Sequence, residues 1–320
     1  MQNSIGIKSL SLASMICFFC FCVLQQSAHS QESESKQLKK QLLDAGAKVE
    51  VYKTTEDSKG EEVKLDIYIF NPSDHKETDK RAAIVFFFGG GWNGGSPGQF
   101  AMQCEYLASR GMVAMTADYR VLSRQGTKAI ACVSDGKSAV RWIRQNAEKL
   151  GVDPDKIVSG GGSAGGHVGA CTGVIKTLDE ETEDSSISSV PNAMVLFNPA
   201  LVLAPVEGLE VSKERKAKMA GLKKRVGADP KTISPLHHVT NGLPPTIIFH
   251  GKEDKTVPYR TAEAFTEAMV KAGNRCELKG YEGQGHGFFN YKSKRGKYDE
   301  IVKEMDAFLV SLGYLAKPTR

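Results

Sequence analysis

A serine surrounded by glycines is the residue best suited to chemistry in this chain. Residues 161–165 read Gly-Gly-Ser-Ala-Gly and come shortly after the apolar pair Ile157 and Val158. A strand, a Gly-x-Ser-x-Gly turn and then small residues are typical of a nucleophile elbow, which holds the serine in a strained conformation at a helix N-terminus. The flanking glycines avoid the clashes that a Cβ would make there. The motif therefore predicts that Ser163 is a nucleophile.

An acid and a base follow in the chain order that such a serine requires. A serine hydroxyl is a poor nucleophile until a base removes its proton. The apolar run 246–250 precedes Asp254, and His286 lies in the glycine-rich stretch 283–288. Serine, then acid, then histidine is the order found in α/β-hydrolases. Glu253 is a rival for the acid, but the spacing of the Gly-x-x-Asp-x-x-Val-Pro stretch favours Asp254.

A run of glycines could supply hydrogen-bond donors to the same site. The apolar run 85–88 is followed by three glycines and then Trp92. Glycines let the backbone pass close to a reacting centre, so we expect the N–H groups of Gly90 or Gly91, together with that of Ala164, to bind an oxyanion. Trp92 has two interpretations, one as a wall of the substrate cleft and one as a packing residue.

These motifs together resemble a known family. The resemblance covers about residues 49–315 and rests on Phe-Gly-Gly-Gly-Trp at 88–92, Asp-Tyr-Arg at 118–120, and the stretches 161–167, 250–258 and 283–288. The chain resembles the α/β-hydrolase esterases related to hormone-sensitive lipase, and more closely the secreted bacterial acetyl-xylan and feruloyl esterase-like group. In one departure, Phe88 stands where that family has a histidine that braces the oxyanion loop.

Composition and patterning predict a single α/β domain. The 320 residues are 41% hydrophobic and 25% charged, and apolar strand-like runs alternate with helical patterns without a linker. We expect an α/β-hydrolase fold over 48–316, with a mostly parallel sheet of eight strands, helices on both faces and a small cap insertion at 198–243. The basic run 223–225 in that insertion is interpreted as a solvated helix face, with a lid over the active site as the alternative.

The individual elements follow from apolar periodicity. Strands are expected at 48–52, 63–70, 82–88, 112–117, 157–159, 193–197, 246–250 and 276–281. Helices are expected at 100–110, 129–150 and 164–177.

The N-terminal 30 residues predict export. An apolar stretch from Leu10 to Leu24 is followed by Ala28, His29 and Ser30, which suit cleavage of a secretory signal peptide after Ser30. An uncleaved membrane anchor is the alternative. A polar leader over 31–47 follows. We expect a secreted or periplasmic protein with no stable membrane association after cleavage.

Other chemistries have little support in the sequence. No cysteine or histidine cluster has metal-ligand spacing, so no metal is expected, and hydrolysis by a serine needs no cofactor. Basic residues are interspersed with acidic ones, which argues against nucleic-acid binding. Beyond the signal peptide, four cysteines are expected to be buried free thiols rather than disulfides, and several polar residues are expected to serve structure. The cysteines are Cys104, Cys132, Cys171 and Cys276, and the structural residues are His167, His237, His238, His250, Asp118 and Asp135.

The sequence thus predicts a secreted serine carboxylesterase acting on short acyl esters. Its partner would be a small ester or an acylated polysaccharide, with acetyl or feruloyl groups implied by the resemblance and by export. Two alternatives stay open. One is an amide-cleaving enzyme of the exopeptidase or arylformamidase type. The other is a catalytically dead hydrolase fold used for binding.

Overall fold

The computed structural model describes residues 36–209, 213–291 and 297–318 of the chain. The chain divides into two units, Met1–Gly46 and Ala47–Arg320. In the first, a helix spans 36–44, within the stretch predicted as a polar leader. The predicted signal peptide and its cleavage site lie outside the described residues. Among the residues that are described, no helix combines the length and apolar character needed to cross a bilayer.

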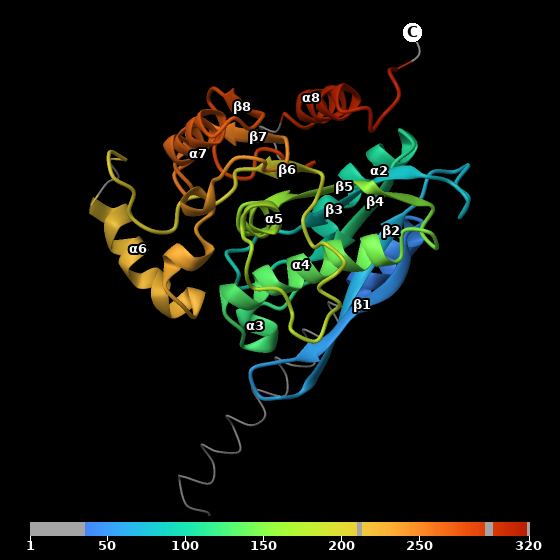
Figure 1. Cartoon of the computed structure of the whole chain (residues 1–320), viewed down its shortest axis with the longest axis horizontal. Helices are drawn as coiled ribbons and strands as arrows, with labels where there is room; N and C mark the ends of the chain where they lie inside the picture. Colours follow the sequence, from blue (N-terminus) through green and yellow to red (C-terminus); the bar gives the residue numbers. More distant parts are fainter. Residues whose placement is uncertain (1–35, 210–212, 292–296, 319–320) are drawn as a thin grey trace, which may run out of the picture. The chain divides into compact units, whose positions relative to one another are not determined.

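The second unit is organised around one eight-stranded sheet of the described residues, in the order β1-β2-β4-β3-β5-β6-β7-β8 (Figure 1). The pairs β1–β2 and β2–β4 are antiparallel, and every other neighbouring pair is parallel. This arrangement confirms the predicted α/β-hydrolase architecture. The strands are β1 (Lys48–Glu56), β2 (Glu62–Phe70), β3 (Arg81–Phe87), β4 (Val113–Ala117), β5 (Val152–Gly162), β6 (Ala193–Phe197), β7 (Thr246–Gly251) and β8 (Cys276–Tyr281).

Helices cover both faces of this sheet because its central strands are apolar on both sides. The helices are α2 (Ala101–Ser109), α3 (Leu122–Gln125), α4 (Ala129–Gln145), α5 (Ala164–Val174), α6 (Lys213–Val226), α7 (Tyr259–Lys271) and α8 (Tyr298–Ser311). Successive residues of a strand point to opposite faces. Phe86 of β3 stacks on Phe100 at the start of α2, whereas Phe87 packs beside Gly136 of α4. Helices α2 and α4 therefore lie on opposite faces, as Figure 1 also shows.

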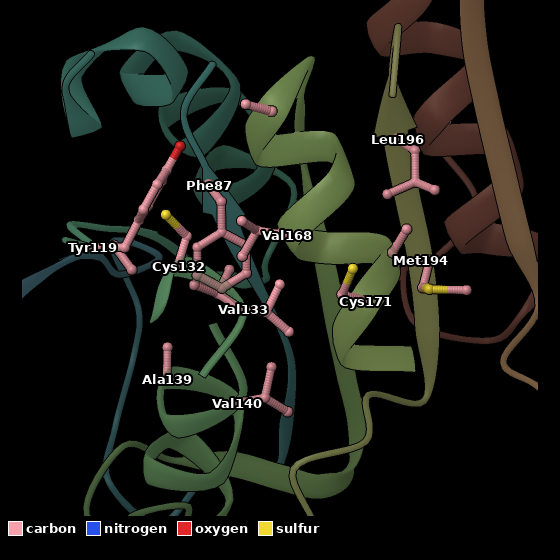
Figure 2. Packing of buried hydrophobic residues seen from close by; sticks show 14 of the residues in the cluster. Phe87, Tyr119, Cys132, Val133, Ala139, Val140, Val168, Cys171, Met194 and Leu196 are labelled. Carbon is pink, nitrogen blue, oxygen red and sulfur yellow. The ribbon is translucent and has the colours of Figure 1, made fainter. Parts of the chain in front are cut away.

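The face covered by α4 and α5 carries a large apolar core. Figure 2 shows Val133 of α4 and Val168 of α5 beside Phe87, with Val140 farther along α4, and all four are fully buried. Removing such side chains from water is the main stabilising contribution to a domain of this size. This core fixes α5, whose first residue follows Ser163, against the sheet.

The opposite face is packed by aromatic rings. Phe197 stacks on Phe249 at 5.3 Å and on Phe289 at 5.1 Å between ring centroids. Phe289 lies three residues beyond His286. The stack of rings therefore attaches the histidine loop to this face of the sheet.

All four cysteines of the described residues are buried free thiols, as predicted. Burial raises the pKa of the Cys132 thiol, which makes it a poor nucleophile. The cysteines pack as small apolar residues in α2, α4, α5 and β8.

Candidate active site

Three predicted residues lie at one edge of the sheet. Ser163 follows β5 directly, Asp254 comes three residues after the end of β7, and His286 comes five residues after the end of β8. The carboxyl ends of parallel strands open on the same edge, where ligands of α/β proteins bind. The topology therefore brings together side chains that are up to 123 residues apart.

The turn at Ser163 has the backbone of a nucleophile elbow. Ser163 adopts φ 55° and ψ −115°, an unfavourable region for a residue with a side chain. Its N–H donates to the Phe197 carbonyl at 2.8 Å, which holds the turn. A Cβ on Gly165 would lie 2.0 Å from the Phe87 carbonyl oxygen, and one on Gly161 would lie 2.4 Å from the same atom. Both glycines of the motif are therefore required by close approach to β3.

The three side chains form one hydrogen-bonded line. His286 Nδ1 lies 2.7 Å from Asp254 Oδ2, and His286 Nε2 lies 2.9 Å from Ser163 Oγ. An ionised carboxylate only accepts hydrogen bonds, so Nδ1 carries the proton and Nε2 accepts one from the serine hydroxyl. In this tautomer the imidazole can remove the serine proton as the hydroxyl attacks.

Asp254 is held as an ionised carboxylate. Its Oδ1 accepts the backbone N–H groups of Thr256 at 2.8 Å and Val257 at 2.9 Å. Burial alone would raise the pKa of Asp254, but hydrogen bonds from His250 and His286 outweigh burial and hold this pKa well below its usual range.

The neighbours of Asp254 behave as structural residues. His250 Nε2 donates to the Val257 carbonyl at 2.8 Å and lies 3.4 Å from Asp254 Oδ2, so His250 braces the acid loop as predicted. Glu253, the rival acid, is exposed, and its backbone N–H donates to the Gln284 carbonyl at 3.0 Å. The geometry therefore places Asp254, and not Glu253, at the imidazole.

The glycine loop after β3 lies against the serine. A Cβ on Gly89 would be 3.3 Å from Ser163 Cβ. Gly90 and Gly91 have φ values of 131° and 63°, which residues with side chains rarely adopt. Among the hydrogen bonds of the described residues, none uses the N–H of Gly90, Gly91 or Ala164. These three donors are available to a developing oxyanion.

The loop keeps its brace although Phe88 replaces the family histidine. Tyr119 Oη donates to the Phe88 carbonyl at 2.5 Å, and the two rings stack at 4.1 Å between centroids. Gln99 Oε1 accepts the Gly89 N–H at 2.6 Å, and Gln99 Nε2 donates to Asn290 at 3.0 Å. The roles of Tyr119 and Gln99 were not predicted from the sequence. One sequence feature could have pointed to Gln99: it is a polar residue between the Pro-Gly pair at 97–98 and the apolar Phe100.

Both interpretations of Trp92 apply. Its indole Nε1 donates to His167 Nδ1 at 3.2 Å, and His167 Nε2 donates to the Ile233 carbonyl at 2.6 Å. Burial lowers the pKa of His167 to about 4, so the ring is neutral and can accept from the indole. His167 thus joins the oxyanion loop to the part of the cap that follows α6, and Trp92 also lines the cavity at Ser163.

A cavity of about 460 Å³ opens beside Ser163 and has mostly apolar walls. Helix α6 forms part of it: the basic run 223–225 is exposed, as expected for a solvated helix face, and its last member, Arg225, also lines the cavity. The described lining residues are Gly91, Trp92, Ser163, Ala164, Ala200, Leu203, Met219, Gly221, Leu222, Arg225, Thr256 and Val257. No group of histidines, cysteines and carboxylates in the described ranges could hold a metal ion.

Comparison with known proteins identifies relatives of this site and fold. The model of the BD-FAE family matches residues 65–269. A probable isoprenylcysteine α-carbonyl methylesterase of Arabidopsis thaliana, ICMEL1, is 25% identical over 264 residues, covering 76% of this chain and 52% of its own. Esterase LipC of Mycobacterium tuberculosis is 29% identical over 227 residues, covering 66% of this chain and 54% of its own. The chain thus spans about half the length of these curated relatives.

Solved structures match over a greater share of both chains. Esterase 2 of Thermogutta terrifontis with butyrate bound is 53% identical, with a TM-score of 0.79, covering 86% of this chain and 97% of that one. The same esterase phosphonylated by sarin is 52% identical, with a TM-score of 0.79, covering 85% and 97%. The sheet order, the hydrogen-bonded serine, histidine and aspartate, and these matches agree. The chain belongs to the BD-FAE family, among the esterases of the α/β-hydrolase fold.

Proposed function

We propose that this chain is an exported serine carboxylesterase that hydrolyses short-chain acyl esters. The observation that carries the proposal is the line from Ser163 Oγ to His286 Nε2 at 2.9 Å and from His286 Nδ1 to Asp254 at 2.7 Å, beside an apolar cavity. Nucleophile, base and orienting acid are in hydrogen-bond contact before any substrate binds. The esterases among its relatives support the same activity.

The reaction proceeds in two steps. Ser163 Oγ attacks the ester carbonyl carbon while His286 Nε2 takes its proton, and the imidazolium then protonates the leaving alcohol as the C–O bond breaks. Water next attacks the acyl-serine, with the same imidazole removing its proton and returning it to Ser163. Asp254 keeps the ring in the required tautomer and stabilises its positive charge.

Backbone donors stabilise the tetrahedral intermediates. The N–H of Ala164, at the start of α5, and those of Gly90 and Gly91 bind the negative oxygen. Preorganised donors of this kind cost no reorganisation during the reaction, and losing one raises the barrier by about 3 kcal/mol. Tyr119 and Gln99 hold the glycine loop in position for this work.

The cavity has room for short acyl groups and apolar walls to receive them. A volume of about 460 Å³ with apolar walls suits acetyl to butyryl chains. Thermogutta terrifontis esterase 2 has been solved with propionate and with butyrate bound, which supports the same range here.

Export and a polymeric substrate complete the proposal. The N-terminal 30 residues direct the chain out of the cytoplasm, and acetyl or feruloyl groups on polysaccharide are the substrates. The sequence features of the leader and the resemblance to exported polysaccharide esterases support this. Fractionation of expressing cells and release of acetate from acetylated xylan test the two points separately.

The test of the activity uses p-nitrophenyl esters of increasing chain length with the purified full-length chain and with Ser163→Ala. We expect wild type to hydrolyse the acetate and the butyrate, and Ser163→Ala to be at least about 10⁴-fold slower on both. Circular dichroism should show that the variant keeps the fold. Hydrolysis of matched anilides in preference to esters would establish an amidase instead. A wild type that is folded but inactive on both esters and anilides would instead indicate a binding protein.

A further inference from the structure

Among the residues that the structure describes, a single cation faces the cavity beside Ser163. Arg225 lies in the last turn of α6, with its Cζ 5.8 Å from the centroid of the Trp92 ring. A Cβ built on Gly91 would be 2.9 Å from Arg225 Nη2. The guanidinium therefore lies against the oxyanion loop, within reach of a ligand held at the serine.

This charge has no counter-ion in the described part of the chain, unlike other arginines near the site. Arg120 pairs with Asp135 at 2.8 Å, and Arg124 pairs with Asp118 at 2.6 Å. Among the described residues, Arg225 has no hydrogen bond or ion pair and makes a cation–π contact with Trp92. A guanidinium has five donors in a rigid fork, so its hydrogen-bonding capacity here is open to a ligand.

The surroundings strengthen the effect of this charge. Arg225 is the one charged residue among the described residues that line the cavity, and Leu203, Met219, Leu222 and Val257 lie on its walls. Arg225 is itself exposed, so the apolar walls strengthen its pairing with a charge once a ligand in the cavity covers the guanidinium. The planar guanidinium matches a carboxylate with two parallel hydrogen bonds.

We propose that Arg225 makes this esterase prefer substrates that carry a carboxylate a short distance from the ester bond. The proposal rests on the esterase function proposed above and adds to it a class of substrate, the half-ester of a dicarboxylic acid or the acyl ester of a hydroxy acid. The carboxylate binds the guanidinium while the ester carbonyl lies at Ser163. Arg225 is then a specificity-determining residue contributed by the cap.

Two pairs of substrates locate the carboxylate. Monomethyl succinate and methyl butyrate differ in charge on the acyl side, whereas 4-acetoxybenzoate and 4-acetoxybenzamide differ in charge on the alcohol side. For at least one pair, we expect the ratio of kcat/KM for the anionic ester to that for the neutral ester to be about tenfold higher in wild type than in Arg225→Gln. The difference should lie mainly in KM. Arg225→Lys keeps the charge without the fork and should lose only part of this preference. Added salt should lower the preference of wild type and leave that of Arg225→Gln unchanged.

Lys224→Gln is the matched control because Lys224 is a neighbouring cation on α6 that does not line the cavity. It should leave the ratio of anionic to neutral ester unchanged. An equal loss on neutral and anionic esters in Arg225→Gln would overturn the proposal and make Arg225 a support for the oxyanion loop. An unchanged ratio in both substrate pairs would also overturn it. Failure of wild type on every ester would instead overturn the proposed esterase function.

Discussion

The nucleophile elbow at Ser163, with helix α5 that follows it, and helix α6 of the cap tolerate substitutions to different degrees. Every residue of α5 is buried, and a Cβ on Gly165 would lie 2.0 Å from a backbone oxygen of β3. On α6, residues 223–225 are exposed, and a Cβ on Gly221 would meet no atom within 4 Å. Both elements line the same cavity. Backbone packing therefore fixes the residues that perform the chemistry. The choice of substrate depends on α6 side chains whose substitution should cost little folding stability.

The largest effect, a loss of activity, is expected from Asp254→Asn, which changes a residue of the hydrogen-bonded line at Ser163. An amide would favour the wrong tautomer of His286 and could not stabilise its cation, so we expect kcat to fall by about 10⁴-fold with little change in KM. Steady-state kinetics on p-nitrophenyl butyrate measure the loss. Glu253→Gln, at the exposed neighbour, is the control and should keep the activity of wild type. A loss in Glu253→Gln with activity retained in Asp254→Asn would show that the acid has been assigned to the wrong residue.

The next effect is on folding and comes from Gly165→Ala. The added methyl would meet the carbonyl oxygens of Phe87 and Phe88 at 2.0 and 2.3 Å, and both are backbone atoms that cannot rotate away. We expect the free energy of unfolding to fall by about 3 kcal/mol or more. Urea titration of the soluble protein measures it. A variant as stable as wild type would mean that the elbow can shift, and the contrast with the cap would fail.

This contrast also explains what the sequence could predict. Glycines that backbone packing requires are visible as a motif, so the three residues that the structure brings together, Ser163, Asp254 and His286, could be predicted from local patterns and chain order. The bounds 193–197 and 276–281 agree with β6 and β8, because short apolar runs between turns mark both ends of a strand. Strand β5 begins at Val152, earlier than the predicted 157, because four polar residues or turn formers obscure its first half.

The side chains that support and shape the site were not predictable in the same way. Gln99 and Tyr119 act through contacts with a loop that lies ten to thirty-one residues away, so a polar residue near a turn and the Asp-Tyr-Arg stretch did not by themselves indicate this role. Arg225 lies in a run of basic residues that is typical of a solvated helix face. Its position at the cavity depends on how the cap folds back on the domain. Such contacts require the tertiary structure.

A smaller effect is expected where the two regions meet, at His167. The unfolded imidazole takes up a proton as the pH falls below about 6.5, whereas burial lowers the folded pKa to about 4. Between these values the unfolded state binds more protons, so stability is full above pH 6.5 and is lost as the pH falls toward 4, by about 3 kcal/mol in total. Urea titrations at pH 7, 5.5 and 4.5 follow the loss, which should be reduced in His167→Gln.

His238→Gln is the matched control because this partly exposed histidine lies outside the Trp92 network and forms a hydrogen bond with the Lys231 carbonyl. Its stability should vary with pH as in wild type. An equal dependence on pH in wild type and His167→Gln would show that His167 is not the group whose protonation loosens the link between the oxyanion loop and the cap.

The smallest effect is expected from Gly221→Ala and has the opposite sign to that of Gly165→Ala. Gly221 lies inside α6 with open space around its Cα, so alanine removes conformational freedom from the unfolded chain without a clash. We expect the free energy of unfolding to rise by about 1 kcal/mol, measured by urea titration. Because Gly221 lines the cavity, the methyl also narrows it and should lower the ratio of butyrate to acetate hydrolysis. A loss of stability would show that α6 packs as tightly as the elbow, and substrate choice would then be no easier to alter than the chemistry.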